Sequence, residues 1–319
     1  MKLKPLLLLL SLLPLAARAE KTVIRVGYFP NVTHAQGVIG SRTTSQGHGW
    51  FEARLGPDVE IQWYAFNAGP SAMEAVFAGS IDLTYVGPNP ALNAYIRSRG
   101  DEIRVLAGAA EGGAALVVAG DGRIKTPADF RGKRVATPQF GNTQDVAARA
   151  WLTKQGFTVT QTGGDVLVVP TANPDQLMAL TTGRVDAVWT VEPWVSRLEQ
   201  EAHGRVFLEQ NDAVVTLLVS SVRFLREHPD LAARFRDAHA ELTVWIGQHE
   251  TEARELVRAG LSATVGREMR AELVAGAWHR LHFTARLEPA QIAGLVADAQ
   301  GAGFLRDAIP LDRLFSGKP

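Results

Sequence analysis

Short apolar runs, each followed by a turn and an amphipathic stretch, dominate the first part of the chain. They predict strands at residues 22–28, 59–66, 81–86 and 103–109, with helices between them. Strands that lead directly into helices are typical of parallel βαβ units. The pattern therefore predicts an α/β protein.

The same pattern recurs in the second part of the chain. Strands are predicted at residues 114–119, 134–136, 166–169, 185–189 and 214–220. Beyond Arg223 the apolar positions follow the helical period, which predicts helices at residues 229–247, 249–259, 267–280 and 288–302. The C-terminal third is therefore expected to be almost wholly helical.

One motif recurs at an offset of 104 residues, with internal spacings of nine, three and three positions in both copies. The two copies are Pro70, Gly79, Asp82, Tyr85 and Pro174, Gly183, Asp186, Trp189. Each predicts a helix that ends at Gly, then an Asp, then a strand with an aromatic residue. Two lobes built on one βαβ plan would produce this repeat; coincidence in a chain rich in Ala and Gly is the alternative.

The N-terminus has the three parts of a secretory signal peptide. Lys2 and Lys4 form a positive region, residues 6–15 are largely apolar, and Ala17-Arg18-Ala19 is a small-x-small cleavage site. The apolar run is shorter than the ~20 residues of a membrane-spanning helix. The sequence therefore predicts export to the periplasm with cleavage after Ala19.

Composition excludes several kinds of site. The 319 residues include no Cys, and 33 basic residues balance 33 acidic ones. The lack of Cys excludes thiolate metal sites and cysteine nucleophiles, and a net charge of −3 without residues 1–19 does not indicate nucleic-acid binding. Because His279 and His282 lack a third ligand and no nucleophile or phosphate-loop motif occurs, no metal site, cofactor or catalytic residue is predicted.

Four Gly-containing turns lie at or near the ends of predicted strands, and three of them lead into helices. Gly lets the backbone approach a ligand closely, and helix N-termini present unpaired N–H groups with partial positive charge. Together the turns predict a cleft that binds a small anion without a matching Arg, although chain reversal and helix capping are the commoner uses of such residues. The candidates are Asn67, Gly69, Ser71, Gly87, Asn89, Gly113, Asn142, Thr143 and Gln144.

Two further features flank the predicted cleft. Glu192-Pro193-Trp194 follows a predicted strand, so that Glu192 would bind a solute amine and Trp194 an apolar stem. In the alternative, Glu192 caps the next helix and Trp194 packs inside the lobe. His34 follows the first strand, where it would either donate to an anion or have a structural role.

The order of these motifs resembles a known class of proteins. The motifs are Gly27-Tyr28-Phe29-Pro30-Asn31-Val32-Thr33-His34-Ala35, Asn67-Ala68-Gly69-Pro70-Ser71, Gly79-Ser80-Ile81-Asp82, Val185-Asp186-Ala187 and Glu192-Pro193-Trp194. Over residues 22–230 the chain resembles the nitrate, sulfonate, taurine and bicarbonate class of ABC-importer substrate-binding proteins. The likeness is closest to the aliphatic-sulfonate-binding members.

The resemblance implies a two-lobed type II periplasmic binding protein fold, with residues 20–110 and 221–319 in lobe 1 and residues 111–220 in lobe 2. It also implies a receptor that delivers a small anionic or zwitterionic solute to an ABC permease and ATPase. The protein is expected to be a monomer and not an enzyme. Motif by motif, ligand contacts are carried over to Asn31 and His34, to the turn residues above, and to Glu192 with Trp194.

Other functions on the same fold stay open at this point. Within the class, the alternatives to a sulfonate or taurine are nitrate, bicarbonate, a thiamine precursor and a riboflavin-type solute. Outside it, the alternatives are an enzyme and a protein that presents its ligand to a sensor. The related enzymes that depend on Cys are excluded, because the chain has none.

Overall fold

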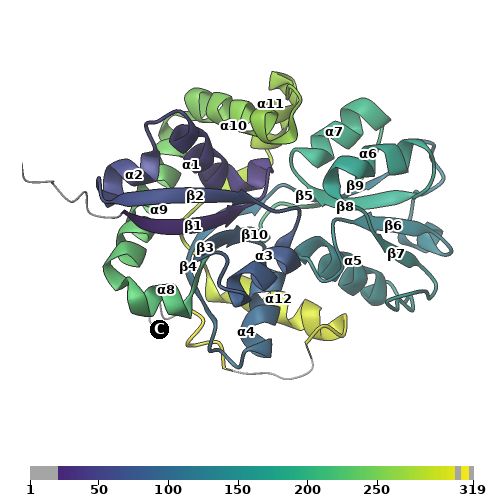
Figure 1. Ribbon diagram of the computed structural model, residues 1–319. Helices are drawn as coiled ribbons and strands as arrows, with labels where there is room; N and C mark the ends of the chain where they lie inside the picture. The colour runs from purple at the N-terminus through teal and green to yellow at the C-terminus, as the bar shows by residue number, and fades with distance from the viewer. Residues whose placement is uncertain (1–20, 306–309, 316–319) are drawn as a thin grey trace, which may run out of the picture.

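The computed structural model describes residues 21–305 and 310–315. The chain forms two lobes, each with a central β-sheet that carries helices on both faces (Figure 1). The predicted signal peptide, residues 1–19, lies outside the described residues. The α/β class predicted from the apolar pattern is confirmed.

Six strands form the sheet of the first lobe and five form that of the second. In spatial order the first sheet is β11 (Leu281–Phe283), β4 (Ile103–Gly112), β10 (Val214–Ser221), β3 (Leu83–Val86), β1 (Thr22–Tyr28) and β2 (Val59–Ala65). The second is β7 (Leu167–Pro170), β6 (Arg134–Thr137), β8 (Ala187–Val191), β5 (Ala114–Val118) and β9 (Arg205–Gln210). Strand β1 runs parallel to β2 and β3, and β6 runs parallel to β7 and β8, as predicted for βαβ units.

The helices of the first lobe come from both ends of the chain. Its N-terminal helices are η1 (Val32–His34), α1 (Ala35–Ser45), α2 (Trp50–Leu55), α3 (Gly69–Phe77) and α4 (Pro88–Arg97). The second lobe contributes η2 (Pro127–Phe130), α5 (Thr143–Lys154), α6 (Asn173–Thr181) and α7 (Trp194–Ala202). The C-terminal helices are α8 (Val222–Glu227), α9 (Pro229–Gln248), α10 (Glu250–Val265), α11 (Ala271–Trp278) and α12 (Pro289–Gly301).

The repeated motif is a repeat of structure as well as of sequence. Asp82 precedes β3 and accepts a hydrogen bond from the backbone N–H of Arg25 on β1 at 2.9 Å. Asp186 precedes β8 and accepts one from the backbone N–H of Arg134 on β6, also at 2.9 Å. In both lobes the Asp carboxylate thus bonds the start of one parallel strand to the neighbouring strand. This confirms that the two lobes share one βαβ plan.

The chain crosses between the lobes twice, at residues 112–113 and 211–213. The first crossing joins β4 to β5 through Gly112 and Gly113, whose φ angles of 75° and 68° favour glycine. The Gly112 N–H donates to the Ala213 carbonyl at 2.9 Å, so the two crossings lie side by side. Strand β10 pairs with β3 and β4 in the first sheet, so the second predicted boundary, at residues 220/221, is wrong and falls before Val214 instead.

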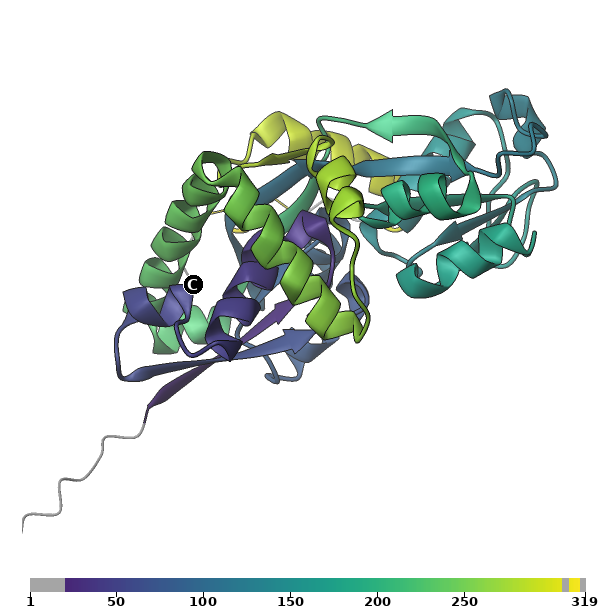
Figure 2. The same cartoon turned by 90° about the horizontal axis from the view of Figure 1, so that it is seen from above.

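The C-terminal helices cover the first lobe and reach the second. Figure 1 shows α10 and α11 above the junction between the lobes and α12 below it, and Figure 2 looks down on the molecule from the side of α10. Helix α11 packs on α7, and α12 packs on both α4 and α5. The helix predicted at residues 267–280 is shorter and runs from Ala271 to Trp278, and the chain from Leu281 pairs with β4 as β11. Strands β9 and β11 were not predicted.

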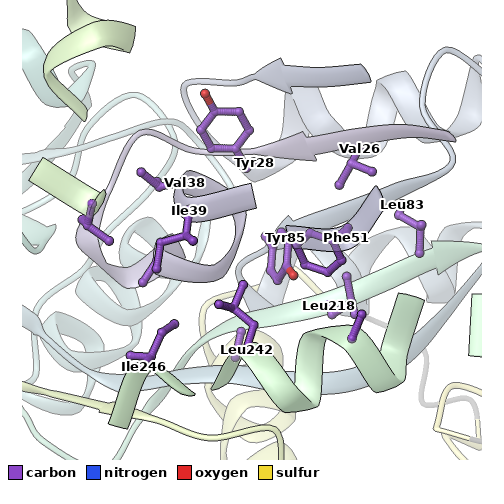
Figure 3. Packing of buried hydrophobic residues seen from close by; sticks show 14 of the residues in the cluster. Val26, Tyr28, Val38, Ile39, Phe51, Leu83, Tyr85, Leu218, Leu242 and Ile246 are labelled. Atoms are coloured by element: carbon purple, nitrogen blue, oxygen red, sulfur yellow. The ribbon is translucent and has the colours of Figure 1, made fainter. Parts of the chain in front are cut away.

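The larger core of the first lobe lies between the sheet and helices α1, α2, α9, α10 and α11 (Figure 3). Val26 and Leu218 on the sheet face Ile39 of α1 and Leu242 of α9 in this core. Within it, His239 Nε2 lies 2.8 Å from the Gly108 carbonyl and Nδ1 lies 3.0 Å from the Tyr85 hydroxyl. A carbonyl only accepts, so Nε2 is the donor and Nδ1 accepts from Tyr85.

Candidate ligand-binding site

A narrow cavity, here called the inner cavity, lies between the lobes. Both lobes contribute to its wall. Its lining residues are Phe29, Asn31, Thr33, His34, Asn67, Ala68, Gly69, Gly87, Pro90, Pro138, Asn142, Thr143, Gln144, Asn173, Val191 and Val215. None of the described residues that line it carries a formal charge when His34 is neutral.

Four helices begin at the wall of the inner cavity. Helices α3 and α4 of the first lobe begin at Gly69 and Pro88, and α5 and α6 of the second begin at Thr143 and Asn173. The capping residues of α3, α4 and α6 form no side-chain bond to the first turn. Unpaired N–H groups and the partial positive charge of these N-termini therefore favour an anion at their meeting point.

A buried ion pair holds the turn before α5. Asp145 is fully buried and accepts from Arg149 Nε at 3.0 Å, from the Thr137 hydroxyl at 2.9 Å and from the Gly141 N–H at 2.9 Å. Its own N–H donates to Asn142 Oδ1 at 2.8 Å. The carboxylate is thus satisfied inside the lobe, and the start of α5 is held rigidly towards the cavity.

His34 presents a free ring nitrogen at the wall. Its ring lies 4.4 Å from that of Phe29, and its Nδ1 is 3.1 Å from the Thr33 hydroxyl. Nε2 is buried and has no hydrogen-bond partner among the described residues. Burial lowers the pKa of His34 to about 3, so the ring is neutral near pH 7. If Thr33 donates to Nδ1, Nε2 carries the proton and donates to a ligand.

The depressed pKa of His34 predicts a loss of stability in acid. Because the unfolded chain binds this proton near pH 6.5 and the folded one only near pH 3, the free energy of unfolding falls as pH drops below 6.5. One such proton contributes at most about 1.4 kcal/mol per pH unit. Urea titrations at several pH values are expected to show a steeper loss for the wild type than for His34→Gln. Equal slopes would contradict a neutral His34. His239, whose pKa is lowered by burial to about 4, is present in both proteins.

Other polar atoms at the wall also lack partners. The Thr143 hydroxyl is buried without a hydrogen-bond partner among the described residues. Asn142 Nδ2 donates to Gln144 Oε1 at 3.1 Å, which orients both amides at the start of α5. Buried polar groups left without partners are costly, so the wall is set up to gain hydrogen bonds from a polar solute.

The structure brings most of the predicted site residues together. Eight of them line the inner cavity: Asn31, His34, Asn67, Gly69, Gly87, Asn142, Thr143 and Gln144. Five lie elsewhere: Ser71, Asn89, Gly113, Glu192 and Trp194. Ser71 donates to the Ala68 carbonyl within α3, and Gly113 belongs to the first crossing between the lobes. Asn89 lies behind the wall, in a smaller cavity that Thr143 also lines.

Glu192 is oriented away from the inner cavity. It is fully buried, accepts from the Ser196 N–H at 3.0 Å and from the Ser196 hydroxyl at 2.9 Å, and pairs with Arg280 Nη1 at 2.9 Å. This is the capping alternative, with an ion pair that the sequence did not reveal. Burial raises the pKa of Glu192, while the bonds from Ser196 and Arg280 lower it.

Trp194 joins the lobes instead of lining the inner cavity. Its indole N–H donates to Asn31 Oδ1 at 2.7 Å. Nearby, the Val32 N–H donates to the Glu192 carbonyl at 3.1 Å. Since Asn31 and Val32 belong to the first lobe and the other two residues to the second, these bonds hold the lobes against each other beside the cavity.

Several lining residues were not predicted as ligand contacts. They are Phe29, Thr33, Ala68, Pro90, Pro138, Asn173, Val191 and Val215. The signal for Asn173 was present, since Asn-Pro-Asp marks a helix start; in the structure Ala172 is the capping residue and Asn173 is the first helical residue. The apolar residues carry no chemical signal and line the cavity through position alone.

Two other kinds of site find no support in residues 21–305 and 310–315. These residues contain no group of three or more His, Asp or Glu side chains that could hold a metal ion. They also contain no helix with the length and hydropathy needed to cross a bilayer.

Comparison with known proteins places the chain in a family. Residues 17–260 match the model of the NMT1-like family. The chain belongs to the NMT1-like family.

Curated relatives of this NMT1-like protein are binding proteins. A putative binding protein of Brucella abortus is 27% identical over 204 residues, which cover 64% of this chain and 59% of the relative. A putative aliphatic sulfonates-binding protein of Escherichia coli is 30% identical over 213 residues, 65% of this chain and 60% of the relative. The taurine-binding periplasmic protein of Escherichia coli is 27% identical over 257 residues, 76% and 75% of the two chains. The match spans under two thirds of the Brucella relative.

Solved structures show the fold. The alkanesulfonate-binding protein of Xanthomonas axonopodis pv. citri, bound to MOPS, superposes with a TM-score of 0.73 at 21% identity, over 91% of this chain and 96% of that one. A Candida albicans protein described as having the generic periplasmic binding protein fold has a TM-score of 0.72 at 14% identity, over 93% and 97%. The predicted two-lobed type II periplasmic binding protein fold of this NMT1-like protein is confirmed.

Proposed function

We propose that this protein is the periplasmic receptor of an ABC importer and captures a small organic anion, such as an aliphatic sulfonate, between its lobes. The observation that carries the proposal is the inner cavity, which lies between the lobes and is walled by uncharged donors and helix N-termini. The relatives that bind aliphatic sulfonates and taurine support the same solute class.

The energetics of such a site suffice for capture. A hydrogen bond to a charged group contributes roughly 1.5–3 kcal/mol, and a helix N-terminus about 0.3–1 kcal/mol. Five or six such contacts offset an association cost near the low end of ~4–15 kcal/mol, which makes micromolar binding reachable. The sulfonate would therefore need no Arg or Lys at the inner cavity.

The place of Glu192 favours a solute without an amine in the inner cavity. Its carboxylate is occupied by Ser196 and Arg280, and no described Asp or Glu lines the cavity. A zwitterion such as taurine would have to bury its ammonium group without a counter-charge, which is costly. We therefore expect an alkanesulfonate to bind more tightly than the aminosulfonate of the same length.

Delivery to a membrane permease and its ATPase is part of the proposal. It rests on the signal peptide predicted from the sequence and on the two-lobed fold. Closure of the two lobes around the solute would give the partner a single solute-bound conformation to recognise. Reconstituting solute-stimulated ATP hydrolysis with the permease complex encoded nearest to this protein would test this part.

Ligand binding is expected to raise thermal stability. At a concentration 100 times its Kd, ethanesulfonate should add roughly 2.7 kcal/mol to the free energy of unfolding. Thermal melts of the mature protein against ethanesulfonate, taurine, nitrate, bicarbonate, a thiamine precursor and riboflavin measure this. A shift with a neutral or cationic solute and with none of the anions would overturn the proposed function, and turnover of the solute on prolonged incubation would favour an enzyme.

A further inference from the structure

A second and larger cavity, here called the outer chamber, adjoins the inner cavity on the side of α7 and α11. Counting the adjoining open solvent, it spans about 1240 Å³, against about 340 Å³ for the inner cavity. Both lobes line it: Pro30, Phe66 and Thr264 belong to the first, and Pro174, Trp194 and Arg197 to the second. The outer chamber is thus part of the same cleft.

The two cavities share parts of their walls. Asn67 lines both of them. Asn31, on the inner side, accepts the indole hydrogen bond of Trp194, on the outer side, at 2.7 Å. Asn173 and Pro174, at the start of α6, line one cavity each. The two cavities therefore lie next to each other and meet at Asn67.

The walls of the outer chamber combine an apolar surface with positive charge. Phe66, Trp194, Met269 and Leu273 supply apolar surface. Arg197, Arg267 and Arg270 also line the chamber, and all three pair with one carboxylate, Glu201, at 3.0, 3.9 and 3.4 Å. Three guanidinium groups thus share a single carboxylate.

The remaining acid at the chamber cancels only part of this charge. Glu268, which also lines the chamber, lies 3.4 Å from Arg258, which itself pairs with Glu255 at 2.7 Å, so one of the three guanidinium charges stays in excess. The side chains of Arg267 and Arg270 are 64% and 53% exposed, so both can turn towards a ligand. The inner cavity, in contrast, has no described cationic side chain at its wall.

We propose that the outer chamber is a second anion subsite, so that the preferred solute carries an apolar body and a second anionic group at the end opposite its head. This inference rests on the proposed function, because it takes the head to be a small anion in the inner cavity. Apolar surface holds the body of the solute, and Arg267 with Arg270 binds the far carboxylate or sulfonate, for which the planar guanidinium is suited.

A series of paired ligands tests the subsite. Alkanesulfonates from ethane- to octanesulfonate are compared by calorimetry with the same chains that end in a carboxylate. Short pairs should bind alike, because the carboxylate does not reach the arginines. Beyond a threshold length the carboxylate should raise the affinity about tenfold, equal to about 1.4 kcal/mol. The gain should shrink at high salt, since both arginines are half exposed.

Variants of the two arginines test whether the gain in affinity from the terminal carboxylate arises in the outer chamber. In Arg267→Gln/Arg270→Gln the long carboxylated ligands should lose the tenfold gain, while ethanesulfonate keeps its affinity. Arg236→Gln is the matched control, since Arg236 pairs with Asp237 on the exposed face of α9 and lines neither cavity. In this control the gain should persist.

The outcomes separate this inference from the proposed function. If ethanesulfonate binds but no carboxylated chain gains affinity, or if the gain survives in the double variant, the second subsite is wrong and the proposed function stands. If no sulfonate of either series binds, the second subsite is wrong, and the thermal melts against the other anions decide whether the proposed function is wrong as well.

Discussion

Replacing Arg280 with alanine is expected to lower the free energy of unfolding by about 3 kcal/mol. Arg280, between α11 and β11 of the first lobe, contacts Glu192 at 2.9 Å, Glu199 at 3.0 Å and Glu209 at 2.8 Å, all in the second lobe. Glu192 is fully buried. Removing one partner of a buried ion pair leaves an uncompensated charge, which typically costs 3–5 kcal/mol. Urea unfolding of the two proteins at neutral pH measures the loss.

The stability lost in Arg280→Ala should depend on pH, because it arises from the charge of Glu192. Because burial already raises the pKa of Glu192 and Arg280 opposes that rise, the Arg280→Ala protein binds a proton there more readily than the unfolded chain does. Its stability should therefore fall as pH rises above the unfolded pKa of about 4.3, more steeply than that of the wild type. Adding Glu192→Gln should recover part of the loss, because no buried charge remains.

A control variant at an exposed ion pair shows whether the loss of stability is specific to Arg280 and its buried partner Glu192. Arg236→Ala removes an exposed pair with Asp237 and should change the free energy of unfolding by less than about 0.5 kcal/mol. If Arg280→Ala were no more costly than Arg236→Ala, or if Glu192→Gln gave no recovery, the buried ion pair between the lobes would not contribute to stability.

Replacing Gly87 with alanine is expected to weaken solute binding by about a hundredfold. Gly87, in the first lobe, contacts Thr143 of the second lobe at the wall of the inner cavity, and a Cβ at Gly87 would lie 2.3 Å from the Thr143 hydroxyl. The φ of Gly87 is −66°, which alanine adopts without strain. The methyl group would therefore keep the lobes apart and move two helix N-termini away from the solute. Calorimetry with ethanesulfonate measures the effect.

A second substitution tests this explanation. Thr143→Ala removes the atom that the new methyl group would meet, so Gly87→Ala should cost little further affinity in a Thr143→Ala background. Gly247→Ala is the control, because a Cβ at Gly247 in α9 meets nothing within 4 Å. That variant should bind as the wild type does. Equal losses from Gly87→Ala in both backgrounds would contradict the proposed contact between the lobes.

Local pattern was enough to predict the fold class and most of its elements. Strand β1 was predicted at the observed residues, and the start of α9 was predicted at Pro229. The repeated motif predicted the common plan of the lobes, because Gly79 and Gly183 end helices with φ of 67° and 68°. Strand β11 was missed because its three residues are a strand only through pairing with β4.

The candidate site was predictable to the extent that helix starts have local signals. Gly87 and Asn142 were found because capping and turn residues have recognisable types. Asn89 and Ser71 have the same residue types but do not line the inner cavity, since a side chain at a helix start can point into the lobe instead of out of it. Sequence type identifies the turn, and only the packed lobe orients the side chain.

The sequence by itself determined the α/β class, the repeat of one βαβ plan and the helix starts that face the inner cavity, because these depend on local periodicity and capping. Only the tertiary structure decided the role of Glu192, which turns from the cavity to Arg280, 88 residues further along the chain. It also decided the grouping of Arg197, Arg267 and Arg270 around Glu201. Ion pairs between distant segments depend on how the lobes pack, and no local pattern in the sequence encodes that packing.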